Sequence, residues 1–239
     1  MSKVLRLVAV VLVLCSASSA LGGWTFLDSF DRQPANPFDL GSNWTQQTSP
    51  SRFQIVNDQA SGSGDFNALM TYNGITAKGV RFDVHHSGST LGDPEHAAAI
   101  LAFDANASKY LQVWLVDNGI GQFHKLYFCD ETGAAWSGMG EDPTVNLSSS
   151  SWFQDAEVTV STDVQASKIT VDIDTDFNGT PDLSYFRSNT PMVITEGVGL
   201  GAFGFSKTDN FRADITPEPA ALLVLGVGTL GLARRRQRR

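Results

Sequence analysis

The chain has 239 residues, of which 42% are hydrophobic, so its size and composition predict one large domain or two small ones and argue against disorder. The formal net charge of -8 averages unlike regions, because the stretch from Leu21 to Pro217 has 10 basic and 24 acidic residues, a net charge of -14. Such acidity excludes nucleic-acid and anionic-lipid binding and suits cations or neutral ligands such as sugars. The alternative interpretation is that the acidity only keeps a secreted protein soluble.

Residues 1–20 have the parts of a secretory signal peptide. A basic start is followed by an unbroken apolar run from Leu7 to Leu14 and by small residues that predict cleavage after Ala20, with cleavage after Gly22 as the alternative. Cys15 lies in this leader, so the mature domain keeps only Cys129 and cannot form an intramolecular disulfide. We expect Cys129 to be a small buried apolar residue.

The tail, residues 216–239, consists of a short motif, an apolar run and a basic end. The motif is Pro217, Glu218 and Pro219. The run from Ala220 to Ala233 spans about 21 Å as a helix, whereas a comfortable membrane crossing takes roughly 20 residues. The basic end, which should stay on the cytoplasmic side, is Arg234, Arg235, Arg236, Arg238 and Arg239. Together these features predict a cleavable sorting signal that anchors the protein transiently in the inner membrane.

The residues from Pro217 to Arg239 resemble a PEP-CTERM sorting domain. The resemblance implies recognition by an exosortase-type membrane protease in bacteria that make exopolysaccharide. It also implies cleavage near the Pro-Glu-Pro motif and release of the domain to the cell surface or the extracellular matrix.

Short runs with a period of two, separated by Gly, Asn, Asp, Ser and Pro, predict about a dozen strands between Gly23 and Ile215. We expect strands within residues 24–30, 52–57, 66–72, 78–84, 97–104, 109–117, 122–129, 156–161, 167–174, 183–186, 199–206 and 209–215. In the run 109–117, for example, Leu111, Val113 and Leu115 form one apolar face. The pattern predicts an all-β, two-sheet sandwich that forms one domain, residues 21–215.

The order of four segments resembles laminin-G-like and concanavalin-A-like jelly rolls. These segments are LDSFDR, LGSNWTQQ, RFQIVNDQAS and, just before the tail, DNFRADI. The resemblance implies a curved sheet whose concave face often binds sugars in relatives, and first and last strands that lie side by side.

Oxygen-bearing side chains recur through the segment that follows residue 173. Asp174, Asp176, Asn178 and Asp182 fall at positions 1, 3, 5 and 9 of a calcium-loop pattern, with a glycine at position 6. Position 12 is Tyr185, which cannot supply the bidentate carboxylate of a strong site. Two interpretations remain open: a weak Ca²⁺ site, and a polar hairpin that turns at the Asn-Gly pair.

Two further groups of polar residues give weaker signals. The carboxylates of Asp28, Asp31 and Asp209 could converge on a cation if the terminal strands pair, or could each end a strand in solvent. The histidines lack a metal-binding spacing, and the adjacent His85 and His86 should point to opposite faces of a strand.

Exposed aromatic rings are the expected platform for a sugar ring. Tyr110 and Trp114 share one face of the run 109–117, and Trp136 occupies a polar loop where core packing is harder to explain. Core packing is the alternative for each of these residues.

The glycosidases of related jelly rolls carry carboxylates in a Glu-x-Asp-x-x-Glu arrangement on one strand, and this spacing does not occur in the chain. We therefore expect a secreted or cell-surface, non-catalytic module that binds carbohydrate, with exopolysaccharide as a candidate partner, or that helps to build the extracellular matrix. The alternatives are a polysaccharide-active hydrolase or lyase, and a purely structural surface protein.

Overall fold

A computed structural model describes residues 23–48, 52–88, 93–104, 109–129, 144–163, 166–188 and 197–215. The predicted signal peptide, the sorting tail and Trp136 lie outside these residues, and only the backbone of Tyr110 is described. No helix in the described part of the chain is both long and apolar enough to cross a membrane.

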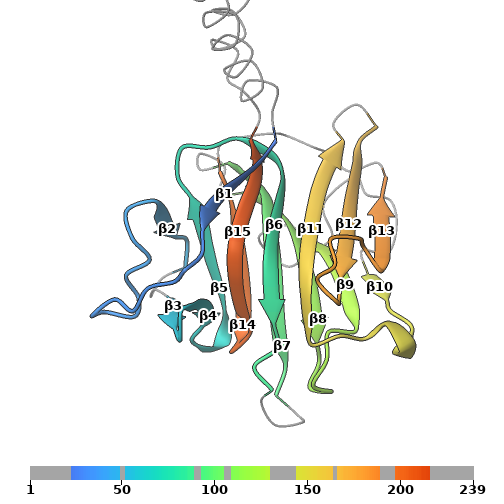
Figure 1. The fold of residues 1–239 in the computed structure, drawn as a ribbon, viewed down its shortest axis with the longest axis horizontal. Helices are drawn as coiled ribbons and strands as arrows, with labels where there is room; N and C mark the ends of the chain where they lie inside the picture. The colour runs from blue at the N-terminus through green and yellow to red at the C-terminus, as the bar shows by residue number, and fades with distance from the viewer. Residues whose placement is uncertain are drawn as a thin grey trace, which may run out of the picture.

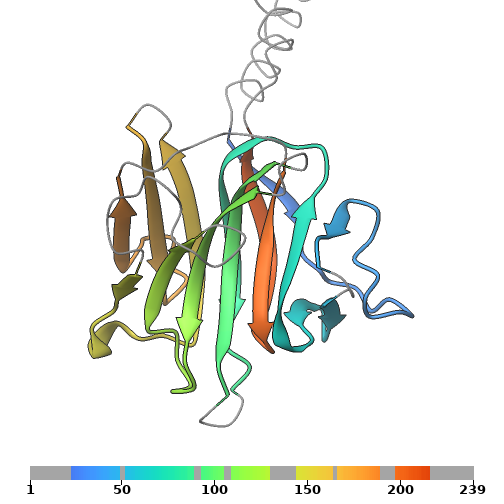
Figure 2. The same ribbon diagram turned by 180° about the vertical axis from the view of Figure 1, so that it is seen from behind.

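The described strands form two antiparallel sheets that face each other (Figures 1 and 2). Sheet A has the order β13 (Leu183–Arg187), β12 (Lys168–Asp174), β11 (Asp155–Asp163), β6 (Ala77–His85), β15 (Lys207–Ile215), β4 (Gln59–Gly62) and β3 (Phe53–Val56), and β1 (Trp24–Asp28) also pairs with β15. Sheet B has the order β10 (Thr144–Asn146), β9 (Lys125–Cys129), β8 (Lys109–Asp117), β7 (Glu95–Asp104), β14 (Val198–Gly204), β5 (Gly64–Tyr72) and β2 (Trp44–Gln46). A single-turn 3-10 helix, η1 (Ser149–Ser151), precedes β11. The predicted all-β sandwich is confirmed.

The core lies between the sheets and is built by strict alternation along the strands. The inward side chains of β8, Leu111, Val113 and Leu115, are buried there, as the sequence pattern predicts. The inward residues of β11 and β12 meet them from sheet A: Ala156, Val158, Val160, Ile169, Val171 and Ile173. Burying a branched aliphatic side chain stabilises the fold by about 1.5–3 kcal/mol, so this alternation fixes which face of each strand points outward.

The two ends of the described chain lie side by side at one end of the sandwich. β1 pairs antiparallel with β15, and Trp24 lies opposite Asp214. In Figure 1 this end is at the top, where β1 begins and β15 ends. The side-by-side terminal strands implied by the jelly-roll resemblance are therefore confirmed.

Three strands were not predicted, and each lacks a clear period-two signal. β2 and β10 have three residues each, and β4 has the sequence QASG, which contains no β-branched or aromatic residue. The β3–β4 hairpin turns through Asn57 and Asp58, which both have positive φ (52° and 61°). Two such residues between paired strands are typical of a type I′ turn.

Candidate functional site

The outer face of sheet B, which points away from the core, carries a continuous row of side chains. Strand pairing places Leu69, Gly201, Ala98, Trp114, Tyr127 and Thr144 next to one another across β5, β14, β7, β8, β9 and β10. These residues lie far apart in the sequence. They form a row only because the register of the six strands brings them together.

Small residues in this row make room for the indole of Trp114. A Cβ atom added to Gly201 would lie 2.9 Å from the Ala98 Cβ and 3.3 Å from the Trp114 Cη2. The ring therefore extends from β8 across β7 to β14. Its Nε1–H donates a 2.7 Å hydrogen bond to Oε1 of Gln112, two residues earlier on the same face.

A second row lies beside the first and consists of Phe203, His96, Val116 and Lys125. The His96 ring stacks on Phe203, with 5.1 Å between ring centroids, and packs edge-on against Trp114. Its Nδ1–H donates a 2.7 Å hydrogen bond to the carbonyl oxygen of Glu95, which leaves Nε2 as an acceptor. Burial lowers the pKa of His96 below its usual value, so the ring is neutral at pH 7.

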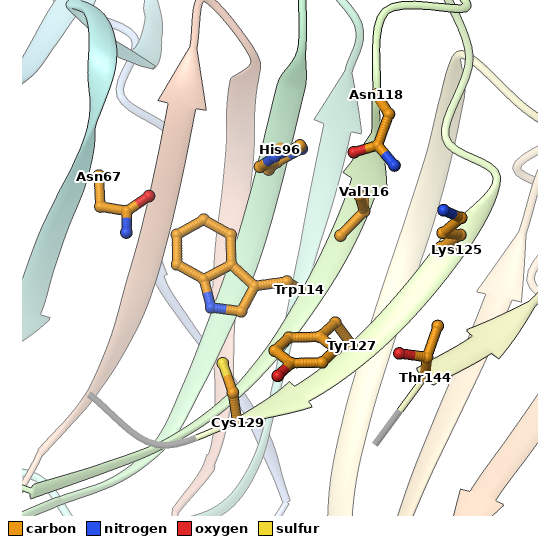
Figure 3. A pocket seen from close by; sticks show the side chains of 9 residues that line it. All are labelled: Asn67, His96, Trp114, Val116, Asn118, Lys125, Tyr127, Cys129 and Thr144. Carbon is orange, nitrogen blue, oxygen red and sulfur yellow. The ribbon is translucent and has the colours of Figure 1, made fainter. Parts of the chain in front are cut away.

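The two rows border an open hollow of approximately 350 Å³, within the range of small-molecule sites. It is lined by Asn67, His96, Trp114, Val116, Asn118, Lys125, Tyr127, Cys129 and Thr144. Figure 3 shows Trp114 at the centre of this group, between His96 on one side and Tyr127 and Cys129 on the other. Aromatic rings combined with amide, imidazole, hydroxyl and ammonium groups can contact a ring-shaped polar ligand on its apolar and its polar sides.

One of the residues that the sequence singles out lines this hollow. Trp114, a predicted sugar-stacking residue, lines it, although the residue is only 7% exposed and so forms a wall rather than an open platform. The side chain of Tyr110 and all of Trp136 are outside the described residues. The structure adds Tyr127 and His96, which come from neighbouring strands and gave no signal in the sequence by themselves.

The predicted calcium-loop residues form a compact acidic group in the loop between β12 and β13. Asp174, Asp176 and Asp182 each place one carboxylate oxygen within 4.8 Å of the others. Carboxylate oxygens at this separation fit a hard divalent cation. The hairpin interpretation is also confirmed in part, because β12 and β13 pair antiparallel. The loop is longer than the two-residue turn of that interpretation, since Ile173 lies opposite Leu183.

Hydrogen bonds hold this loop in a defined shape. Asp174 accepts from the N–H groups of Gly179 (2.6 Å) and Asn178 (3.3 Å), and Asp182 accepts from the N–H group of Thr175 (2.8 Å). Burial alone would raise the pKa of Asp174, but the backbone N–H donors outweigh it and the pKa lies below its usual value. Tyr185, at position 12 of the pattern, packs against the core.

The second predicted cation group, Asp28, Asp31 and Asp209, is not a set of converging carboxylates like that of the β12–β13 loop. Asp28 forms a 2.6 Å ion pair with Arg32 and accepts a 2.7 Å hydrogen bond from Nε1 of Trp44, so its carboxylate fixes the start of the fold. Asp209 is partly buried, and burial raises its pKa. Among the described residues, the group of three or more acidic, histidine or cysteine side chains close enough for one metal ion is the one in the β12–β13 loop.

Comparison with known proteins identifies the tail and the fold. Residues 216–239 match the PEP-CTERM protein-sorting motif. This motif indicates that the chain is exported with a membrane-anchored sorting signal, and it implies processing by an exosortase. No curated protein matches the chain.

Several solved structures share the sandwich at low sequence identity. The CBM2 module of Lactobacillus casei BL23 phage J-1 evolved Dit is 10% identical and matches 82% of this chain and 97% of its own, with a TM-score of 0.51. A winged bean acidic lectin complexed with methyl-alpha-D-galactose is 10% identical and matches 81% and 99%, with a TM-score of 0.48. Carbohydrate binding module CBM66 from Bacillus subtilis is 10% identical and matches 72% and 95%, with a TM-score of 0.43. At this identity the likeness establishes the lectin-like jelly-roll fold alone.

Proposed function

We propose that this protein is a non-catalytic module of the bacterial cell surface or extracellular matrix that binds a polysaccharide through the outer face of sheet B. The observation that carries the proposal is the hollow around Trp114. Its aromatic wall, formed by Trp114 and Tyr127, suits the apolar face of a sugar ring. The polar groups of Asn67, Asn118 and Lys125 around that wall suit its hydroxyl groups.

The sorting signal and the charge of the domain are consistent with such a ligand. A protein that an exosortase releases outside the cell meets exopolysaccharide at once, which makes this polymer the proposed partner. The net charge of -14 between Leu21 and Pro217 disfavours polyanions and does not disfavour a neutral glycan.

Affinity electrophoresis against a panel of soluble neutral polysaccharides tests the proposal. The purified protein should be retarded by at least one of them. Tyr127→Ala should weaken the affinity derived from that retardation about tenfold, because the loss of one aromatic contact costs about 1.4 kcal/mol. Phe186→Ala is the matched control, because Phe186 is an exposed aromatic residue (59%) on sheet A, away from the hollow. Equal retardation of wild type and Tyr127→Ala would contradict the proposed site.

The same panel separates binding from the alternative functions. Release of reducing ends or unsaturated products by the purified protein would identify a hydrolase or a lyase. Retardation by none of the polysaccharides would favour a purely structural role.

We also propose that the β12–β13 loop binds Ca²⁺ weakly through Asp174, Asp176, Asn178 and Asp182. The support is the close approach of the three carboxylates and the ordering of the loop by the hydrogen bonds of Asp174. The ion would link β12 to β13 at the edge of sheet A, which makes its proposed role structural. This loop lies on the other sheet from the hollow, so the two proposals stand independently.

A further inference from the structure

A buried polar cluster joins the two sheets at the end of the sandwich opposite the chain termini. Its members are His86, which follows β6 of sheet A, and Glu95, Asp117 and His124, which belong to sheet B or to the segment before β9. Glu95 and Asp117 have no exposed surface, and the two histidines are 9% exposed. Neither proposed ligand site contains these residues.

The contacts of Asp117 organise this cluster. Its carboxylate accepts hydrogen bonds from the backbone N–H groups of Gly119, Ile120 and Gly121 at 2.8–3.1 Å, which fixes the turn between β8 and β9. It also accepts a 2.8 Å hydrogen bond from Nε2 of His86 across the two sheets.

His86 is the residue through which the cluster crosses between the sheets. The Gly88 N–H group donates to His86 Nδ1 at 3.1 Å, so Nδ1 is an acceptor and Nε2–H is the donor to Asp117. Glu95 Oε2 lies 3.7 Å from the same Nδ1 and accepts a 2.8 Å hydrogen bond from the Ser87 N–H group. The backbone N–H group of His86 donates to the carbonyl oxygen of Gln154, the residue just before β11 of sheet A.

Each member of the cluster on the side of sheet B is the chain neighbour of a residue that lines the hollow. Glu95 precedes His96, Asp117 lies between Val116 and Asn118, and His124 precedes Lys125. Alternate residues of a strand point to opposite faces, so a cluster that is fixed on the inner side sets the position of these neighbours on the outer side.

We infer that His86, Glu95 and Asp117 are positioning residues of the glycan hollow, an inference that rests on the proposed function. The buried cluster clamps the ends of β7, β8 and β9, and so holds His96, Asn118 and Lys125 at fixed separations around Trp114. Buried ionic groups seldom add net stability, because desolvation offsets their attraction, whereas a cluster whose hydrogen bonds are satisfied holds its elements in one arrangement. The cluster thus explains how His96, Asn118 and Lys125 keep fixed positions although they lie where β7, β8 and β9 meet loops.

The adjacent histidines provide a matched pair of variants. His86→Leu removes the link between Asp117 and sheet A. His85→Leu removes a similar hydrogen bond of 2.9 Å, from His85 to Asp155, on the exposed face of β6 and one residue before His86. Asp117→Asn and Asp155→Asn form the corresponding carboxylate pair. Glu95→Gln replaces Asp117→Asn if that variant does not fold.

The test measures polysaccharide affinity by affinity electrophoresis, well below the melting temperature of each variant, and the titration of His96 by NMR. His86→Leu should weaken binding about tenfold, a change of 1.4 kcal/mol, while His85→Leu binds as wild type does. Asp117→Asn or Glu95→Gln should lower the pKa of His96 further, because both carboxylates favour its protonated form. Asp155→Asn should leave this pKa unchanged.

The two readouts distinguish failure of this inference from failure of the proposed function. If the wild type binds no polysaccharide in the panel, the proposed function fails and the inference fails with it, whatever His96 shows. If the wild type binds, and folded His86→Leu binds equally well with an unchanged His96 signal, the positioning role of the buried cluster is contradicted. The proposal that the hollow binds a glycan is then unaffected. Loss of binding in both His86→Leu and His85→Leu would also contradict the positioning role, because the effect would not be specific to the buried cluster.

Discussion

The indole of Trp114 can lie flat across sheet B because Ala98 and Gly201 beside it have almost no side chain. The alternation along β8 predicts that Trp114 points away from Leu111, Val113 and Leu115, and this prediction is confirmed. The same alternation cannot predict that a glycine from β14 lies next to it. That neighbour depends on the register of three strands, which a single sequence does not reveal.

Gly201→Val tests this packing directly. The added Cβ would lie 2.9 Å from the Ala98 Cβ, which forces the backbone of β14 or β7 to shift, and 3.3 Å from the Trp114 Cη2, which presses on the indole. We expect a loss of about 1–3 kcal/mol in the free energy of unfolding, despite the better strand propensity of valine, and a changed near-UV circular dichroism signal. Urea denaturation measures the loss, with Thr170→Val on the outer face of β12 as the control. An unchanged spectrum and stability would show that Trp114 does not pack on Gly201.

His96 makes the stability of the protein depend on pH in a predictable direction. Its pKa is lowered by burial in the folded protein, so at mildly acidic pH the unfolded chain binds a proton that the folded chain does not. The contribution of His96 is therefore complete above a pH of about 6.5 and is lost as the pH falls from there through the folded pKa, with a slope of at most about 1.4 kcal/mol per pH unit. As the pH falls through this range, the unfolding free energy of the wild type should therefore decrease more than that of His96→Gln. Parallel curves would contradict the burial of a neutral ring.

The β12–β13 hairpin shows what a motif can and cannot predict about an element. The carboxylates of Asp174, Asp176 and Asp182, three residues of the calcium-loop spacing, lie close together, and the chain reverses between β12 and β13 as the Asn-Gly pair predicts. The length of the loop was not predictable, because the hydrogen bonds that Asp174 accepts from Gly179 and Asn178 replace those of a tight turn. The β3–β4 hairpin is the converse case, since Asn57 and Asp58 signal the turn while β4 itself has no strand pattern.

Calcium should raise the melting temperature if the acidic loop binds it. For a dissociation constant of about 1 mM, about 10 mM Ca²⁺ stabilises the protein by about 1.4 kcal/mol, or about 3–6 °C for a domain of this size. Asp176→Asn should abolish this increase and leave the melting temperature in chelator nearly unchanged, because Asp176 is exposed. Thermal melts in Ca²⁺ and in chelator measure both effects. A wild-type protein whose melting temperature does not respond to Ca²⁺ has no such site.

At the scale of the whole molecule, the chain ends and the buried cluster occupy opposite ends of the sandwich. β15 ends at Ile215, and the match to the sorting motif begins at the next residue, so the tail follows directly from the end of the sandwich where β1 and β15 pair. The tail was predictable because its three parts are contiguous in sequence. The cluster around His86 was not, because its partners Glu95 and Asp117 reach it only after both sheets have formed.

Replacing Pro217, Glu218 and Pro219 with alanine should prevent processing of the tail. The variant is expected to stay in the membrane fraction at its unprocessed mass, because the exosortase would no longer recognise it, while the folded domain is unaffected. Cell fractionation and mass determination test this outcome. Normal release of the variant would contradict the role of the Pro-Glu-Pro motif.

We propose that sheet B, and not sheet A, carries the glycan site. Its most direct test is an NMR titration of the purified protein with an oligosaccharide from the polysaccharide that retards it most. We expect the largest shifts at the Trp114 Nε1–H group and at His96, Lys125 and Tyr127, with small shifts at Arg81 and Thr170 on sheet A. Largest shifts on the outer face of sheet A or in the β12–β13 loop would contradict it.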